Sequence, residues 1–376
     1  MLSTLRRPRW PAYQAKQSAI APISVGNVRE PDVSIRLTLA CMTASRNTIR
    51  YRHTLLRAGP LRLDGGSMFG LIPRTVWQRF APTDDRGRIT VSHNCLLLER
   101  LDDAPDGSNL PGRAPKLILL EGGTGDKLDE KSRELFALDG TTVLSALHAV
   151  NCRAEDIGLI TATHLHFDHA GGFTRLCQPG EVPDWTGPGS SMGSAQHTRA
   201  IKRSFPNAVH VAQRREWEDA LANRSVMTRT YFADHLEPLR EVTKLIESPL
   251  PFAAGVIPDK SEMPVLPHLL REIEVAPGLF AFMVPGHTWG QQAFRFTSAE
   301  GKPTVFVPDV MPTAWHVGQA FSLAYDVEPY TSSVSRNWLL KTAMEQQWTL
   351  LLDHEPAHPS FTVRANQSGW YDLVPA

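Results

Sequence analysis

The sequence predicts a layered α/β domain, and three observations support that fold class. Short apolar stretches typical of buried strands alternate with segments of helical periodicity along most of the 376 residues. Hydrophobic residues make up 42% and charged residues 21% of the chain, a globular composition that excludes a wholly disordered protein. No internal repeat of about 20–50 residues is visible, so a solenoid or a propeller is not expected.

The first 53 residues differ from the rest in charge. They hold nine Lys/Arg and two Asp/Glu, a balance of +7, whereas the whole chain has 39 of each, so the remainder carries −7. The early arginines Arg6, Arg7 and Arg9 lack the apolar segment of a secretory signal after them. We expect residues 1–53 to form a basic, mostly disordered extension and residues 54–376 to form one folded domain.

Composition also limits partners and compartment. The net charge of the whole chain is zero, and the acidic body would repel phosphates, so nucleic-acid binding is not expected. No run of 18 apolar residues occurs, so no membrane span is expected. The four cysteines form no C-x-x-C pair, which favours a reducing compartment such as the cytoplasm, with organelle targeting by the basic extension as the alternative.

The predicted elements follow in chain order. Apolar runs predict strands, Pro-, Gly-, Asp- and Ser-rich segments predict loops, and spacing of three to four residues between apolar positions predicts helices. Strands are expected at Cys95–Glu99, Lys116–Glu121, Ile157–Ile160, Leu279–Val284, Thr304–Val307 and Thr349–Leu352. Loops are expected at Asp102–Pro115 and Gln178–Ser194, and helices at Lys127–Phe136, Val143–Ala149, Arg214–Ala222 and Asp234–Ile246.

Residues 161–172 read TATHLHFDHAGG and follow an expected strand. His164 and His166 are two positions apart, so an extended backbone places them on one side. Asp168 and His169 come next, before a Gly pair that permits a sharp turn. Imidazole and carboxylate groups in this mixture are ligands that zinc favours.

The same arrangement recurs three times later in the chain. His287, Asp309 and His354 each follow within a few residues of an expected apolar strand. Ligands delivered from several strand ends converge on one rim of a sheet, where the strands hold them accurately. The sequence therefore predicts one metal site assembled from four distant segments.

The H-x-H-x-D-H segment with its Gly pair, the later P-G-H-T, the later Asp and the final His together resemble the metallo-β-lactamase-fold hydrolase superfamily. The resemblance covers about residues 92–355, and Leu63–Gly70 is similar to a feature of lactonase relatives. It implies a four-layer αβ/βα sandwich with two divalent metal ions, most often Zn²⁺, with Mn and Fe as alternatives. One departure is Glu355, where many relatives have Asp.

The resemblance also implies roles for seven residues. His164, His166 and His287 would bind the first ion, Asp168, His169 and His354 the second, and Asp309 would bridge both. Two ions that share a water lower its pKa from about 15.7 towards 7, so the expected nucleophile is a hydroxide. Asp168 is the expected catalytic residue, because it would hold the hydroxide and pass a proton to the leaving group.

The sequence gives less information about the residues that would contact the substrate. The segment between His169 and His287 resembles the substrate-contacting region of N-acyl homoserine lactonases, and Tyr231 within it is a candidate to offer a phenol to the substrate. Met68 and Phe69 are candidates for an apolar pocket wall, and His316 for a group near the bridging Asp309. For each of these, a packing role is the alternative.

The leading hypothesis is a hydrolase of small esters or lactones. On the same fold, the alternatives are a thioester hydrolase like glyoxalase II, an iron-dependent sulfur dioxygenase, or a phosphoester hydrolase. A non-enzymatic sensor that binds a small molecule through the metals is the alternative from another functional class.

Overall fold

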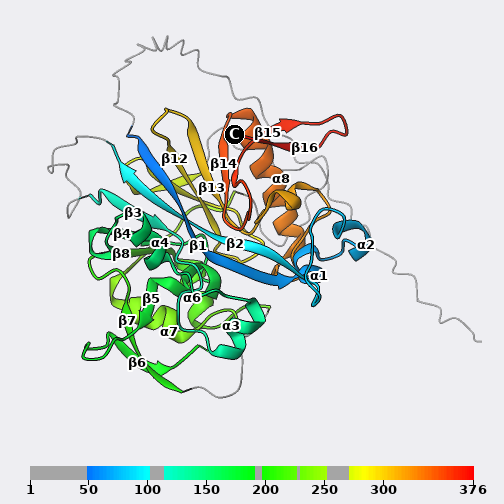
Figure 1. Ribbon diagram of the computed structural model, residues 1–376. Helices are drawn as coiled ribbons and strands as arrows, with labels where there is room; N and C mark the ends of the chain where they lie inside the picture. The colour runs from blue at the N-terminus through cyan, green and yellow to red at the C-terminus, as the bar shows by residue number, and fades with distance from the viewer. Residues whose placement is uncertain (1–48, 102–113, 191–196, 227–228, 252–270) are drawn as a thin grey trace, which may run out of the picture. The chain divides into compact units, whose positions relative to one another are not determined.

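The computed structural model describes residues 49–101, 114–190, 197–226, 229–251 and 271–376 (Figure 1). Their first sheet has six strands, and β1 pairs antiparallel with β2 along nearly its whole length. From β3 to β9 the neighbouring strands are parallel. In spatial order the strands are β1 (Tyr51–Asp64), β2 (Arg88–Arg100), β3 (Leu117–Leu120), β4 (Leu159–Thr161), β8 (Val209–Gln213) and β9 (Thr243–Ile246).

The second sheet has seven strands in sequence order. They are β10 (Glu272–Ala276), β11 (Leu279–Met283), β12 (Gln292–Thr297), β13 (Pro303–Val307), β14 (Thr349–Leu352), β15 (Ser360–Ala365) and β16 (Tyr371–Pro375). Only β13 and β14 are parallel, and the long helix α8 (Pro329–Glu345) joins them as a crossover. A small third sheet has the order β5 (Thr174–Leu176), β7 (Thr198–Arg203) and β6 (Trp185–Pro188).

The remaining helices are short. The α-helices are α1 (Gly65–Phe69), α2 (Arg74–Trp77), α3 (Glu130–Phe136), α4 (Val143–Ala149), α5 (Phe167–Ala170), α6 (Arg214–Leu221) and α7 (Ala233–Leu236). The 3₁₀ turns are η1 (Ala154–Asp156), η2 (Gly171–Phe173), η3 (Glu237–Val242) and η4 (Ala314–Val317). None of the described helices is long and apolar enough to cross a membrane.

Alternating side chains divide the core into layers. On β2, Leu96 and Leu98 lie between the two large sheets, against Phe294 and Phe306 of the second sheet. The intervening side chains of β2 face the opposite way, into a cluster that α4 and α6 cover. On the far side of the second sheet, Trp338 and its neighbours on α8 cover the strands (Figure 1). The order helix, sheet, sheet, helix confirms the predicted four-layer sandwich.

Most predicted elements are present, and the differences have physical causes. The helix expected over Asp234–Ile246 ends at Leu236, because Pro238 lacks an N–H and the chain continues as η3 and then as β9. The expected loop Gln178–Ser194 contains β6, which pairs with β7. α3 begins at Glu130 rather than Lys127, since the Asp129 side chain accepts the backbone N–H of Ser132.

The extension was expected to end at residue 53, and β1 begins at Tyr51. Residues 1–48 and most of the loop expected at Asp102–Pro115 lie outside the described residues. The ligand-bearing segments all follow strands: β4 in the first sheet precedes the H-x-H-x-D-H segment, and β11, β13 and β14 in the second sheet precede His287, Asp309 and His354. The site therefore forms where the ends of the two sheets meet.

Candidate metal centre

The H-x-H-x-D-H segment is held in place by close backbone contacts. After β4 the chain carries His164 and His166 in a loop and places Asp168 and His169 on α5. A Cβ added to Gly171 would lie 2.2 Å from the carbonyl oxygen of Thr124, and one added to Gly172 would lie 2.0 Å from that of Gly122. Only glycine allows this approach, so the Gly pair fixes the segment against residues 122–124.

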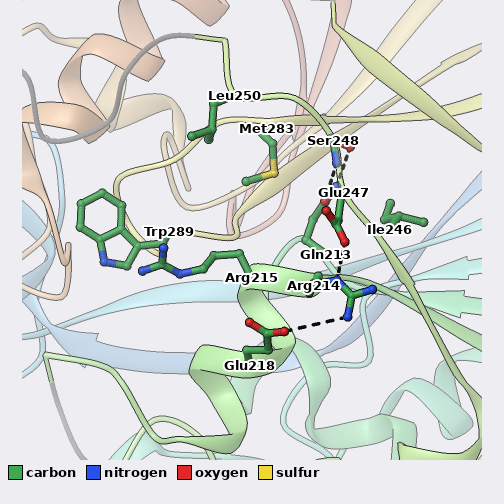
Figure 2. A pocket seen from close by; sticks show the side chains of 10 residues that line it. All are labelled: Gln213, Arg214, Arg215, Glu218, Ile246, Glu247, Ser248, Leu250, Met283 and Trp289. Carbon is green, nitrogen blue, oxygen red and sulfur yellow. Dashed lines mark hydrogen bonds and ion pairs between the residues drawn. The ribbon is translucent and has the colours of Figure 1, made fainter.

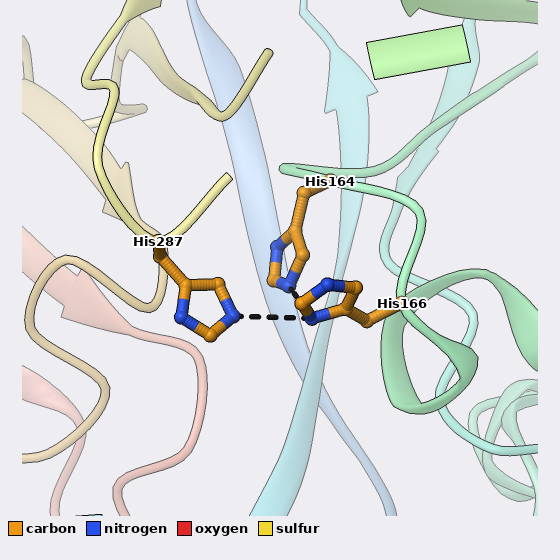
Figure 3. Close-up of side chains that lie close together, drawn as sticks. All are labelled: His164, His166 and His287. Atoms are coloured by element: carbon orange, nitrogen blue, oxygen red, sulfur yellow. Dashed lines mark hydrogen bonds between the residues drawn. The ribbon is translucent and has the colours of Figure 1, made fainter. Parts of the chain in front are cut away.

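Three imidazoles from two loops meet in the first cluster (Figure 3). His166 Nδ1 lies 3.0 Å from His164 Nε2 and 3.1 Å from His287 Nε2. All three rings are buried. Nitrogens that bind one tetrahedral zinc at about 2.0–2.1 Å lie about 3.3 Å apart, so the observed spacing is close to that of a ligand set.

The second cluster combines imidazoles and carboxylates. His354 Nε2 lies 3.2 Å from His169 Nε2 and 3.6 Å from Asp168 Oδ2. Asp309 contacts both clusters: its Oδ2 lies 3.2 Å from His287 Nε2, and its Oδ1 lies 3.4 Å from His354 Nε2. The structure thus brings together all seven residues that the sequence singled out, with Asp309 between the two groups.

A further carboxylate lies in the second cluster. Asp353, at the end of β14, offers an oxygen within 4.8 Å of ligand atoms of His169, Asp309 and His354. From the sequence, a strand is expected at Thr349–Leu352 and His354 is assigned to the site, but Asp353, which lies between them, is not assigned. The rule that identified the other ligands, a polar residue directly after a buried strand, applies equally to Asp353.

Most of the imidazoles are fixed by a partner on their other nitrogen, as is usual for metal-binding histidines. His169 Nδ1 lies 3.1 Å from Glu121 Oε2, and His287 Nδ1 lies 2.9 Å from Asp326 Oδ1. The other two contacts are between His164 Nδ1 and Thr163 Oγ1, at 3.1 Å, and between His354 Nδ1 and the carbonyl oxygen of Ser92, at 2.9 Å.

Three threonines lie next to the motif residues, and only one of them contacts an imidazole of the clusters. Thr163 contacts the ring of His164. Thr161 donates its hydroxyl to the carbonyl oxygen of Val211, and Thr288 donates its hydroxyl to Glu216.

Burial and neighbouring charges shift the pKa values of the cluster. Burial lowers the pKa of His164 and His166 well below the ordinary value, and the surrounding histidines lower it further. For His169, burial lowers the pKa, but Glu121, Asp168 and Asp309 outweigh it and raise the pKa well above the ordinary value. For Asp309, burial raises the pKa, but His354, His287 and His169 outweigh it and the net pKa is lowered.

The donor set fits divalent cations. Asp309 Oδ1 and both carboxylate oxygens of Asp353 are buried and have no hydrogen-bond partner in the described part of the chain. Buried carboxylate oxygens are normally hydrogen-bonded or bound to a cation. Two clusters of buried imidazoles, joined by such carboxylates, have the composition of a two-metal site.

A cavity of about 260 Å³ opens above the two clusters. His166, Asp168, His287, Asp309 and His354 line its base. Its other lining residues are of two kinds. The apolar ones are Leu63, Met68, Leu135, Phe136 and Phe167, and those with polar groups are Ser225, Arg229, Thr230 and Tyr325. This volume suits a small molecule.

Of the four candidate substrate residues, one lines this cavity and the other three are not among its lining residues. Met68 lines it. Tyr231 donates its hydroxyl to Glu216 Oε1, at 2.9 Å, and packs its ring on His166. His316 is bonded at both nitrogens, to Thr313 Oγ1 and to the carbonyl oxygen of Met68, and it stacks on Phe69. These three side chains are positioned to support His166 and Met68 rather than to contact a substrate.

The phenol in the cavity belongs to Tyr325, which sequence reasoning did not identify. Burial raises the pKa of Tyr325 to about 12, and the nearby carboxylates Asp64, Asp168 and Asp309 act in the same direction, while a hydrogen bond with Ser67 opposes them. Tyr325 therefore remains a protonated donor at neutral pH. No predicted strand precedes this residue, so the pattern that identified the ligands carried no signal for it.

A larger cavity, of about 620 Å³, lies between α6 and the end of β9 (Figure 2). Its charged groups have partners: Arg214 pairs with Glu218 and Glu247 of the same lining, and Arg215 pairs with Asp219 outside it. Arg215 also lies over the ring of Trp289, 5.7 Å from its centroid. Neither of the two buried clusters lines this cavity, whereas members of both line the smaller one.

Comparisons with known proteins agree with this geometry. Residues 116–255 match the family model described as metallo-beta-lactamase superfamily. A probable metal-dependent hydrolase from Staphylococcus aureus is similar in structure, with a TM-score of 0.63 and 22% identity over 88% of this chain and 99% of that one. AidC, a dizinc quorum-quenching lactonase, has a TM-score of 0.58 and 15% identity over 87% of this chain and 98% of its own.

A third similar structure is the hydrolase AbOPH of the beta lactamase superfamily, with a TM-score of 0.58 and 17% identity over 88% of this chain and 97% of that one. A search of curated protein sequences gave no significant match. At these levels of identity, the structural likeness shows a shared fold. Together with the family model, it confirms the resemblance that the sequence motifs indicated.

Proposed function

Given a chain with the metallo-β-lactamase fold, we propose that the protein is a dinuclear metal-dependent hydrolase of small esters or lactones. The observation that carries the proposal is the pair of buried His/Asp clusters, joined by Asp309, at the base of a small cavity. The similar fold of AidC, a dizinc quorum-quenching lactonase, supports this substrate class.

The two clusters support a division of the proposed ligands between two ions. His164, His166 and His287 would hold one ion, and His169, His354 and Asp168 the other, with Asp309 shared. Two divalent ions in such a site supply an activated water at neutral pH and polarise a carbonyl oxygen. Zn²⁺ suits the imidazole-rich cluster, and Mn or Fe would also fit the mixed one.

Side chains of the protein would transfer the proton and bind the substrate. Asp168 lines the cavity beside His354 and can take a proton from an attacking water and pass it to the leaving oxygen. Tyr325 can donate a hydrogen bond to a substrate oxygen in the same cavity, since its raised pKa keeps it protonated.

The cavity wall supports a substrate with an apolar part. Leu63, Leu135, Phe136 and Phe167 form an apolar lining next to the proposed metal ligands, and Met68 completes it. Such a wall would hold a short acyl or alkyl group and exclude water from the carbonyl. The polar groups of Ser225, Arg229 and Thr230 on the same cavity would face the other end of the substrate.

Metal analysis combined with a substrate panel tests the proposal. The purified protein would be assayed for bound metals and then with lactones, aryl esters, thioesters and phosphotriesters, with oxygen uptake followed in parallel. We expect two ions per chain and fastest turnover of lactones or aryl esters. A single iron with oxygen uptake would replace this function with that of a dioxygenase, and preference for thioesters or phosphotriesters would reassign the substrate.

A matched pair of histidine variants controls for folding. His166→Ala removes a buried member of the first cluster, whereas His148→Ala removes an exposed histidine on α4. We expect the first variant to lose metal and turnover and the second to keep both. Wild-type turnover in His166→Ala would contradict the assignment.

A further inference from the structure

Asp353 has a setting that is unusual for a carboxylate. It is 2% exposed, and neither of its oxygens has a hydrogen-bond partner in the described part of the chain. Its backbone is well fixed, because its N–H donates to the carbonyl oxygen of Val307 and its carbonyl oxygen accepts from Asn94. The backbone thus fixes the position of the residue, and its buried carboxyl group has no hydrogen-bond partner among the described residues.

The nearest functional groups are those of the second cluster. An oxygen of Asp353 lies within 4.8 Å of ligand atoms of His169, Asp309 and His354. The carboxylates of Asp168 and Glu121 also act on it electrostatically. Several carboxylates gathered around two imidazoles, away from water, would be stabilised by a bound cation.

We propose that Asp353 is an additional carboxylate donor to the ion held by His169, Asp309 and His354. The inference rests on the proposed two-metal site and extends it beyond the seven residues that the superfamily pattern implies. An unpartnered, buried carboxylate beside two imidazoles has the position and the free electron pairs that a ligand needs.

This assignment makes the two metal positions chemically different. The first has three imidazoles and shares only Asp309, so it is the softer site. The second would have two imidazoles and three carboxylates, Asp168, Asp309 and Asp353. Harder ions such as Mn²⁺ prefer oxygen donors, so the second position would accept Mn²⁺ more readily than the first.

Metal titration of Asp353→Asn tests the proposal, with Asp326→Asn as the matched control. Asparagine keeps the size of the side chain and removes its charge. Asp326 is also a buried aspartate, and it contacts His287 of the first cluster instead. Each full-length, metal-free protein would be titrated with Zn²⁺ or Mn²⁺ against a chromophoric chelator, and bound metal would be counted by elemental analysis after gel filtration.

We expect the wild type to bind two Zn²⁺ and Asp353→Asn to bind the second ion at least about 10-fold more weakly. Mn²⁺ binding would fall in Asp353→Asn and remain in Asp326→Asn. Wild-type metal affinity in Asp353→Asn, or equal loss of Mn²⁺ in both variants, would overturn the proposal. A wild type that does not bind two ions would instead overturn the proposed function itself.

Thermal unfolding in the presence of chelator separates a ligand from a structural residue. Replacing this buried carboxyl group, which has no hydrogen-bond partner in the part of the chain that the structure describes, should leave the melting temperature of the metal-free protein unchanged or higher, while the increase caused by Zn²⁺ becomes smaller. A metal-free Asp353→Asn protein that is less stable than the wild type, or unfolded, would show that the carboxylate stabilises the fold without metal and would overturn the proposal.

Discussion

Glu216 on α6 links the two loops that carry the first cluster, and its removal is a sharp test of the site's construction. Its carboxylate is buried and accepts three hydrogen bonds, from Leu165 N at 2.9 Å, Tyr231 Oη at 2.9 Å and Thr288 Oγ1 at 2.6 Å. Leu165 lies between two of the histidines, and Thr288 follows the third. Burial raises the pKa of Glu216, and the three donors oppose that shift.

The two substitutions of Glu216 should differ strongly in cost. In Glu216→Ala, three buried donors lose their acceptor, at about 1–3 kcal/mol each. Because water can enter the space left by the side chain, we expect a total loss of about 3–5 kcal/mol. In Glu216→Gln, the amide oxygen can still accept from Leu165 and Tyr231, and the Thr288 hydroxyl can turn to accept from the amide group. We expect this change to cost less than about 1.5 kcal/mol.

Urea unfolding of the metal-free variants, followed by circular dichroism, measures these costs. Glu218→Ala on the same helix is the control, since its pair with Arg214 is exposed and should contribute less than about 0.5 kcal/mol. We also expect Glu216→Ala to bind Zn²⁺ more weakly, because the loops that carry His166 and His287 lose their common support. Equal stability of the Ala variant and the wild type, or equal losses for Ala and Gln, would refute the reasoning.

Three further predictions concern the cavity and the ligands. Asp168→Asn should lower kcat by about 10²-fold or more while reducing metal content less, as a comparison of turnover and elemental analysis would show; equal loss of both would leave Asp168 only a ligand role. Tyr325→Phe should lower kcat by about 10²-fold with metal content unchanged, and wild-type kinetics would exclude a role for the phenol. The pKa values of His169 and His287 are raised, so at a given pH more of each ring is in the imidazolium form than for a free histidine, and metal must displace that proton; Zn²⁺ affinity should therefore rise from pH 6 to pH 8. Calorimetry in buffers of different ionisation enthalpy should detect proton release on Zn²⁺ binding at pH 7, and no release would contradict these pKa directions.

The seven proposed metal ligands could be selected from the sequence because each follows a buried strand closely. A strand end fixes the direction of the next few residues, so chain spacing carries spatial information there. The same reasoning could have found Glu121 and Asp353, which directly follow β3 and β14. Glu121 even adopts a positive φ of 70°, which is a strained conformation for a residue with a side chain, and it accepts the N–H of Thr163 while contacting His169.

The supporting and substrate-facing groups could not be predicted in this way. Glu216 lies on a helix and Asp326 in a loop, and their contacts with the ligand loops depend on tertiary packing that no local pattern reports. Tyr231 and His316 illustrate the same limit, since each lies near the site but directs its polar atoms to protein partners. The position of Pro238 explains the one expected helix that the fold replaces with a turn and a strand.

Anomalous diffraction from crystals of the metal-loaded protein tests the central claim most directly. Data collected on both sides of the zinc absorption edge would locate bound ions without reference to activity. We predict two peaks about 3.5–4 Å apart, one among His164, His166 and His287 and one beside His169 and His354, with Asp309 reaching both. Peaks elsewhere on the protein, or a single ion that leaves one cluster empty, would contradict the account.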